Sequence, residues 1–322
     1  MSNYRFVQLD VFTEEPFTGN PLAVFPEAEG LSDENMMKIA REMNLSETVY
    51  VLKPETNQQQ ADDKPQVLRK LRIYTPVREI PFAGHPVVGT WNCLAREGIV
   101  PVPEGGNGTV RIHQEVGIGI LPVDIEFEAG VPVQVVMTQG KASVGDIIED
   151  RGEQEDLARA LGLRIEDLDE TLPIQIMSTG LPFLAVPVRS LADLGRCKVN
   201  SSLLAEIYQR AGATGCSAFS RETIGIGRER VHTRMFAPGD NIAEDPATGS
   251  AAGALGGYLV HHGVANIEPE DGRYRFVLEQ GDFMHRPSRV NLDIKGQPGS
   301  VEEVKVGGPS VVVANGEVMV ND

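Results

Sequence analysis

The sequence lacks the features that define several large classes of protein. Its three cysteines, Cys93, Cys197 and Cys216, are odd in number and widely spaced, so they predict neither a disulfide framework nor a paired-cysteine metal site. No apolar run approaches the roughly 20 residues of a membrane span. The N-terminal residues lack the basic and apolar segments of a signal peptide. These absences predict a cytoplasmic protein.

Positive charge is also scarce. The chain has 29 Lys and Arg residues against 46 Asp and Glu residues, a formal net charge of −17. This balance disfavours nucleic acid and anionic membranes as partners, because both carry negative charge. The chain does have length and apolar content: 322 residues, 41% of them hydrophobic, are enough for two ordinary domains with buried cores.

Local patterns predict more strands than helices. Short apolar runs bounded by glycine, proline and charged residues predict strands at 5–12, 22–25, 48–52, 67–74 and 109–113. Helices are predicted at 32–43, with Ser32 as the N-cap, and at about 153–161 and 202–210. Because each half of the chain carries both kinds of element, the predicted fold class is α+β.

The two halves resemble each other in three segments that recur in the same order. TGNPLAV at 18–24 recurs as TGLPFLAV at 179–186, RIYTP at 72–76 as RMFAP at 234–238, and HPVVGT at 85–90 as DPATGS at 245–250. The separation is 64 positions from Pro21 to His85 and 63 from Pro182 to Asp245. This order predicts an internal duplication of about 160 residues, with an active-site cleft between two similar domains.

The third repeated segment predicts two helix N-termini. His85 or Asp245 would be the N-cap, followed by a proline at the first helical position. The helices would cover 90–96 and 250–261, and Gly89 and Gly249 would allow close approach of backbone or ligand. Unpaired N–H groups and the helix dipole at both starts would bind an anion, such as a substrate carboxylate.

Simpler explanations exist for the same residues. Asp245 is interpreted equally well as a structural cap, and Gly249 as a packing residue. The two predicted caps, however, are different residue types, His and Asp, and such a pair is suited to acid/base catalysis on a substrate. Glu47 stands in a polar turn just before a predicted strand. It is either a solvated turn residue or a carboxylate that faces the cleft. Arg72 and Arg234 would bind a substrate carboxylate or lie on the surface.

Five longer segments resemble successive signatures of the PhzF-like phenazine-biosynthesis family. They are QLDVFTEEPFTGNPLAVF at 8–25, REMNLSETVYVL at 41–52, EIPFAGHPVVGT at 79–90, EDPATGSAAGALGGYL at 244–259 and QGDFMHRPSR at 280–289. The resemblance runs from about residue 5 to residue 289. It implies a diaminopimelate-epimerase-like fold of two pseudo-symmetric α+β domains, each a curled sheet around a central helix, and usually a homodimer. We expect the domains at 1–125, with 308–322 packing back on it, and at 126–307.

The resemblance also implies a chemistry. The general acid/base glutamate falls on Glu47 through NLSET, the cleft histidine on His85 through GHP, and an aspartate and a serine on Asp245 and Ser250 through EDPATGS. Within the matching motifs, further predicted substrate-binding residues are Asn20, Gly84, Thr90 and Gly249. The family member of the phenazine pathway isomerises its substrate by moving a proton between two ring carbons, with no metal, nucleotide or organic cofactor. The expected function is therefore an isomerase acting on a small carboxylate-bearing substrate.

Other functions remain open at this stage. They include a non-catalytic binding or scaffold protein of the same fold and an epimerase of an amino-acid-like small acid. A two-thiol racemase is disfavoured, because His85 and Asp245 occupy the predicted cap positions. The glycines at 224–227 lack the strand and helix context of a dinucleotide site. The remaining histidines, at positions 113, 232, 261, 262 and 285, have no convincing metal-ligand spacing.

Overall fold

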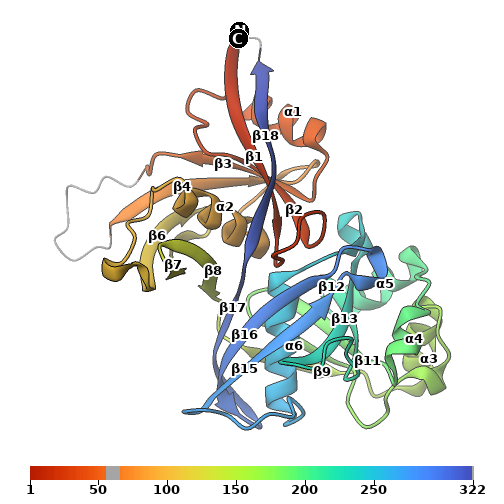
Figure 1. Ribbon diagram of the computed structural model, residues 1–322. Helices are drawn as coiled ribbons and strands as arrows, with labels where there is room; N and C mark the ends of the chain where they lie inside the picture. The colour runs from red at the N-terminus through yellow and green to blue at the C-terminus, as the bar shows by residue number, and fades with distance from the viewer. Residues whose placement is uncertain (56–65, 321–322) are drawn as a thin grey trace. The chain divides into compact units, whose positions relative to one another are not determined.

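The computed structural model describes residues 1–55 and 66–320. Contacts divide the chain into two compact units, Met1–Met137 with Gly307–Asp322 (unit 1) and Thr138–Val306 (unit 2). Unit 1 extends beyond residue 125, where the first predicted domain ends, because β8 (Val131–Thr138) pairs with β7 (Gly119–Glu128). The first and last strands, β1 (Ser2–Val11) and β18 (Ser310–Val320), lie side by side as an antiparallel pair (Figure 1).

Unit 1 is built on one mixed sheet in the order β18–β1–β2–β3–β4–β6–β7–β8. The β2–β3 and β4–β6 pairs are parallel and the others are antiparallel. A short strand, β5, pairs with β4. The remaining elements are β2 (Asn20–Phe25), α1 (Asp33–Met43), β3 (Glu47–Leu52), β4 (Val67–Tyr74), β5 (Glu79–Ile80), α2 (Gly84–Arg96), a 3-10 turn (Glu104–Gly106) and β6 (Gly108–Val116).

The two helices of unit 1 cover opposite faces of this sheet. The predicted N-cap of α1 is confirmed, because the Ser32 side chain accepts a hydrogen bond from the Asn35 backbone. The apolar side of α1 packs on Phe25 and Tyr50. Helix α2 contacts β18, β1, β2, β3 and β7, and its residues from Gly84 to Ala95 are all buried. A helix that is buried on every side has no need of a polar face.

Unit 2 contains a sheet in the order β9–β10–β11–β12–β13–β15–β16. The β11–β12 and β13–β15 pairs are parallel and the others antiparallel. Its elements are β9 (Ser143–Ile147), α3 (Arg151–Ala160), β10 (Gln175–Ser178), β11 (Pro182–Pro187), α4 (Leu191–Gly195), α5 (Ser201–Arg210), β12 (Gly215–Ser220), β13 (Glu229–Ala237), β14 (Ile242–Asp245), α6 (Gly249–His261), β15 (Arg273–Gln280), β16 (Ser288–Gln297) and β17 (Ser300–Gly308), with 3-10 turns at Ile165–Asp167, Pro238–Asp240 and Asp282–Met284.

The order of pairings in unit 2 matches that in unit 1. From β1 to β7, the successive pairings are antiparallel, parallel, antiparallel, parallel and antiparallel, and the same series runs from β10 to β16. In both units a helix follows the short strand, β5 or β14, and is buried along most of its length. The protein therefore has a mixed fold of strands and helices. The shared order supports the predicted duplication.

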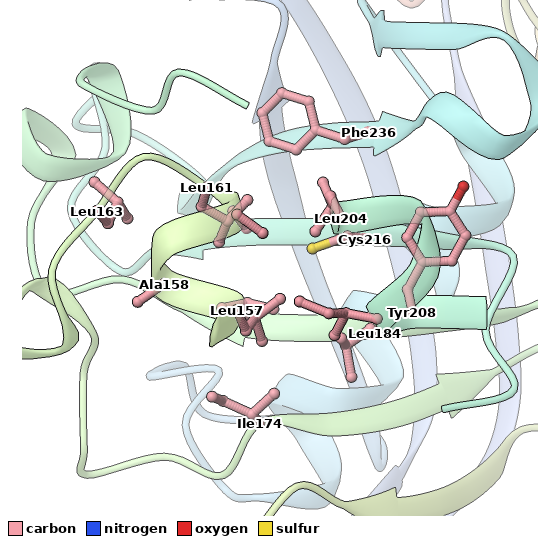
Figure 2. Close-up of a cluster of buried hydrophobic side chains, with 14 of the residues drawn as sticks. Leu157, Ala158, Leu161, Leu163, Ile174, Leu184, Leu204, Tyr208, Cys216 and Phe236 are labelled. Carbon is pink, nitrogen blue, oxygen red and sulfur yellow. The ribbon is translucent and has the colours of Figure 1, made fainter. Parts of the chain in front are cut away.

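One face of the unit 2 sheet carries a large apolar cluster. Figure 2 shows Leu157 of α3, Leu161 just after that helix and Leu204 of α5 over Leu184 and Cys216 of the strands. These five side chains are fully buried, and burial of one leucine side chain stabilises a fold by about 1.5–3 kcal/mol. The opposite face of the sheet packs against α6, which contacts β10, β11, β15 and β16.

Candidate active site

Three of the predicted site residues meet in unit 1. Glu47 is the first residue of β3, and His85 is the second residue of α2. The Glu47 Oε2 atom lies 3.2 Å from His85 Nε2, and Asn20 Nδ2 lies 3.4 Å from His85 Nδ1. The fold thus joins residues that are 65 positions apart in the chain.

The direction of the Glu47 side chain follows from strand alternation. Tyr50 and Leu52 of β3 belong to the apolar cluster under α1. Because successive side chains of a strand point to opposite faces, Glu47 points to the other face, where α2 lies. The structure therefore brings Glu47 beside a buried histidine instead of leaving it as a solvated turn residue.

Burial sets the charge state of His85. Its side chain is 6% exposed, and loss of solvation lowers the pKa of His85 to about 3, so the ring is neutral at physiological pH. The Asn20 Nδ2 atom only donates hydrogen bonds, so Nδ1 of His85 accepts and the single ring proton resides on Nε2. The nitrogen that carries this proton lies 3.2 Å from Glu47 Oε2, without hydrogen-bond geometry. The pair is a glutamate side chain next to a neutral imidazole.

The start of α2 has no side-chain cap, and neither has the start of α6. Their N-cap residues, Ala83 and Thr248, make no capping hydrogen bond. In the other α-helices of the described residues, a side chain caps the start; the caps are Ser32, Asp150, Ser190 and Asn200. Backbone N–H groups at an uncapped helix start, here at Gly84 and Gly249, are suited to bind an anion.

The predicted residues of unit 2 gather at the start of α6. Asp245 ends β14 and is buried, Gly249 begins the helix, and Ser250 is its second residue. The Thr248 hydroxyl donates a hydrogen bond to Asp245 Oδ2. Gln139 Nε2 donates to the Gly249 carbonyl at 2.9 Å, which fixes the first turn of the helix.

The predicted match between HPVVGT and DPATGS is wrong by several residues. Helix α2 begins at Gly84 and α6 at Gly249, so these two glycines correspond and His85 corresponds to Ser250. Neither His85 nor Asp245 is an N-cap. Helix α2 begins earlier than predicted because Pro86 lies in its first turn, where a missing N–H group costs nothing.

Two equivalent ion pairs agree with the corrected match. Arg72 Nε donates to Glu79 at 2.8 Å in unit 1, and Arg234 Nε donates to Glu244 at 2.8 Å in unit 2. Each glutamate stands five residues before the first residue of the helix. The two arginines therefore bind carboxylates of the chain itself.

Two residues of α2 lie away from its start. A Cβ atom on Gly89 would approach Leu22 Cδ2 to 2.6 Å and Val11 Cγ2 to 2.7 Å, so this glycine allows close packing of helix and sheet. Thr90 is fully buried in the second turn, and it adds no hydroxyl donor at the helix start. The close approach expected at Gly89 is therefore to the side chains of Leu22 and Val11, and Thr90 lies beyond the helix start because the helix begins at Gly84.

Sequence reasoning missed the residues that support the unit 2 site. Gln280 Nε2 donates to the Asp245 carbonyl at 2.8 Å, and Ser288 Oγ donates to the Pro246 carbonyl at 2.9 Å. Both belong to the segment QGDFMHRPS at 280–288. That segment was visible as a motif, but nothing in one sequence indicates what its side chains contact.

Thiol chemistry has little support in this geometry. Burial raises the pKa of Cys93 to about 12 and that of Cys197 to about 11, and it raises the pKa of Cys216 as well. Within residues 1–55 and 66–320, no group of three or more His, Cys, Asp or Glu side chains is arranged to hold a metal ion. None of the helices in the described chain is both long and apolar enough to cross a membrane.

Comparison with known proteins identifies the family. The model of the family described as phenazine biosynthesis-like protein (PhzC-PhzF) matches residues 9–316. The chain is 35% identical over 318 residues to an uncharacterized isomerase of Clostridium acetobutylicum, covering 99% of both chains. It is 34% identical over 313 residues to the trans-2,3-dihydro-3-hydroxyanthranilate isomerase of Pseudomonas aeruginosa, covering 97% of this chain and 98% of that one. The chain belongs to the PhzF-like family.

Solved structures agree with this assignment. A PhzF-family protein of Bacillus anthracis superimposes with a TM-score of 0.84 at 27% identity, covering 99% of this chain and 100% of that chain. A probable proline racemase of Agrobacterium radiobacter shares the fold, with a TM-score of 0.63 at 12% identity, covering 99% and 93% of the two chains. The predicted relationship to the epimerase-like fold is confirmed. The cleft between the two halves stays a prediction.

Proposed function

We propose that this protein is an isomerase that moves a proton between two carbons of a small carboxylate-bearing substrate. The observation that carries the proposal is the 3.2 Å contact between Glu47 Oε2 and Nε2 of His85. Because His85 stays neutral, it does not neutralise Glu47 as a cation would. A largely buried carboxylate beside a neutral imidazole is suited to accept a proton from carbon.

The proposed reaction needs no net exchange of atoms or electrons. Glu47 takes a proton from one substrate carbon, and the electron pair of that C–H bond enters the conjugated part of the substrate. The glutamic acid then returns the proton to a second carbon, and the carboxylate is restored. The isomerase named trans-2,3-dihydro-3-hydroxyanthranilate isomerase, 34% identical to this chain, supports this reaction class. We propose that no cofactor takes part.

The substrate carboxylate is proposed to bind at uncapped helix starts. Gly84 and Gly249 supply backbone N–H groups there, and Ser250 adds a hydroxyl donor. Asn20 orients His85 through its ring nitrogen. Asp245 is proposed to act on the same substrate as Glu47. A homodimer remains a proposal from the family resemblance, and location in the cytoplasm remains a proposal from the sequence.

Solvent exchange tests the proposed function. The protein is incubated in deuterium oxide with trans-2,3-dihydro-3-hydroxyanthranilate, and with a panel of cyclic and acyclic amino and hydroxy acids. We expect deuterium at carbon in at least one product, detected by NMR and mass spectrometry. Incorporation accompanied by a shifted double bond supports the isomerase, and incorporation with inversion at one carbon favours an epimerase. Binding of these acids without any exchange would favour the non-catalytic protein.

The role of Asp245 has its own variant. Asp245→Asn keeps the shape of the side chain and removes its charge, and we expect a large loss of exchange. Ser250→Ala should raise the substrate concentration needed for half-maximal exchange. Wild-type exchange in Asp245→Asn would remove Asp245 from the mechanism while leaving the proposal for Glu47 intact.

A further inference from the structure

The short segment between β14 and α6 is held in place by four residues that lie outside both elements. This segment is Pro246, Ala247 and Thr248, and it joins Asp245 to the helix. The side chains that hold it or its flanks are Gln139, Gln280 and Ser288. Gly281 is the fourth, since a Cβ atom there would lie 2.6 Å from the Pro246 carbonyl. Most of these contacts come from the segment at 280–288.

Gln280 makes three hydrogen bonds to the segment. Its Nε2 atom donates to the Asp245 carbonyl at 2.8 Å and to Thr248 Oγ1 at 3.1 Å. Its Oε1 atom accepts from the Thr248 N–H at 3.3 Å. Gln280 is 1% exposed. A buried amide with both ends in use has a single orientation.

The amide of Gln280 determines where the Thr248 proton goes. An amide nitrogen only donates, so Thr248 Oγ1 is the acceptor in its contact with Gln280. The one hydroxyl proton of Thr248 is then donated to Asp245 Oδ2. Gln280, Thr248 and Asp245 therefore form a directed chain of hydrogen bonds that ends on the carboxylate.

The same chain leaves the start of α6 open. Threonine is a favoured N-cap residue because its oxygen can accept a helix N–H group. Here the Thr248 hydroxyl is occupied by Gln280 and Asp245, and the helix has no side-chain cap. One orientation of Thr248 thus fixes the carboxylate and keeps backbone N–H groups available.

Unit 1 lacks this chain at the corresponding positions. In the corrected alignment of the two units, Ile80 is equivalent to Asp245 and Ala83 is equivalent to Thr248. Lys70 and His232 are equivalent residues of β4 and β13, and they pair with Glu115 and Glu279 on the neighbouring strands. The next residues along those strands, Val116 and Gln280, are therefore equivalent as well. All three positions in unit 1 are apolar, so the hydrogen-bond chain occurs only in the unit that carries Asp245.

We propose that Thr248 and Gln280 are positioning residues, which hold Asp245 Oδ2 in place and keep the start of α6 uncapped for the substrate carboxylate. The proposal rests on the proposed function, since it assigns them to the action of Asp245. Neither residue donates or accepts a proton in the reaction. Gln280 acts through Thr248.

Variants with matched shapes test this proposal. Thr248→Val removes the hydroxyl and keeps the volume, whereas Thr248→Ser keeps the hydroxyl. Gln280→Met removes the amide and keeps the length of the side chain. The first readout is the carboxyl ¹³C resonance of Asp245 at fixed pH, in protein labelled at aspartate and assigned with Asp245→Asn. It requires no turnover, and a circular dichroism melt checks that each variant is folded.

We expect the Asp245 resonance to move in Thr248→Val and Gln280→Met and to keep its wild-type position in Thr248→Ser. Adding Gln280→Met to Thr248→Val should change the resonance little, because Gln280 acts through the hydroxyl. In the exchange assay, kcat should fall about 100-fold in Thr248→Val, as expected for a misplaced catalytic group, and Thr248→Ser should restore it.

A Thr248→Val protein with the wild-type resonance and wild-type kcat would overturn the proposal. So would a Thr248→Ser protein that behaves like Thr248→Val, because the effect would then come from the methyl group. If the resonances move as expected but the wild-type protein exchanges no proton with any acid, the hydrogen-bond chain is supported and the proposed function is contradicted. The two failures are therefore distinguishable.

Discussion

The neutral state of His85 predicts a loss of stability in mild acid. The ordinary pKa of histidine is 6.5, and burial lowers that of His85 to about 3. Between these values the unfolded chain binds a proton that the folded protein does not bind. The contribution of His85 to the free energy of unfolding is therefore complete above pH 6.5. It falls by about 1.4 kcal/mol for each pH unit below that value, down to pH 3. At pH 5 the contribution of His85 is a loss of about 2 kcal/mol relative to pH 7.5.

Urea unfolding at pH 7.5 and pH 5.0 measures this loss. His85→Gln cannot gain a proton, so its free energy of unfolding should fall by about 2 kcal/mol less than that of the wild-type protein between the two pH values. Any loss of packing in the variant is the same at both pH values and cancels in the comparison. The ring ¹⁵N resonances of His85 should also report a neutral imidazole at pH 5.

Equal losses in the wild-type protein and in His85→Gln would refute this reasoning. A protonated ring at pH 6 would have the same effect. In either case His85 and Glu47 would form a true ion pair. Glu47 would then be stabilised as a carboxylate, and the argument for it as a base beside a neutral imidazole would fail.

Two further changes test the corrected match between the units and the packing of α2. Glu244→Gln should lower the free energy of unfolding by about 3–5 kcal/mol, because the side chain of Arg234 is only 10% exposed and loses its charged partner. Glu79→Gln at the corresponding position should lower the free energy of unfolding by about 1 kcal/mol, since Glu79 is 41% exposed. Equal losses for the two variants in urea unfolding would contradict the argument that burial makes the Arg234–Glu244 pair more important for stability. Gly89→Ala should cost about 1–3 kcal/mol through its contact with Leu22, with unchanged exchange activity per folded molecule. Loss of substrate binding at full stability would instead make Gly89 a ligand-binding residue.

The sequence predicted those parts of the fold that depend on local patterns. The cap of α1 is at Ser32, as predicted, and the buried residues Met36, Ile39 and Ala40 of this helix have the spacing of one helical face. The arginines at 72 and 234 were correctly paired as equivalent. These features depend on residues close together in the chain, whose preferences one sequence displays.

The match between the two halves failed where tertiary contacts decide the geometry. Arg72 and Glu79 are seven positions apart, whereas Arg234 and Glu244 are ten apart. The longer connection contains the 3-10 turn Pro238–Asp240. Aligning proline and glycine letters alone therefore gave the wrong register at the helix starts.

The sequence predicted which residues form the site better than it predicted how these residues are arranged. Family motifs indicated Glu47 and His85, but only strand alternation in the folded sheet directs Glu47 toward α2. The roles of Gln280 and Thr248 depend on a contact across 32 residues of the chain. A buried glutamine gives no periodic signal by which sequence reasoning could find it.

The most direct test of the central claim compares proton exchange in three proteins. Glu47→Gln removes the proposed base, and Glu42→Gln changes an exposed glutamate of α1 as a control. With the best substrate in deuterium oxide, the account predicts that Glu42→Gln exchanges like the wild-type protein. It predicts that Glu47→Gln loses about 100-fold to 10,000-fold of the rate, the usual contribution of a general acid/base residue. Deuterium incorporation in Glu47→Gln at the wild-type rate would contradict the account.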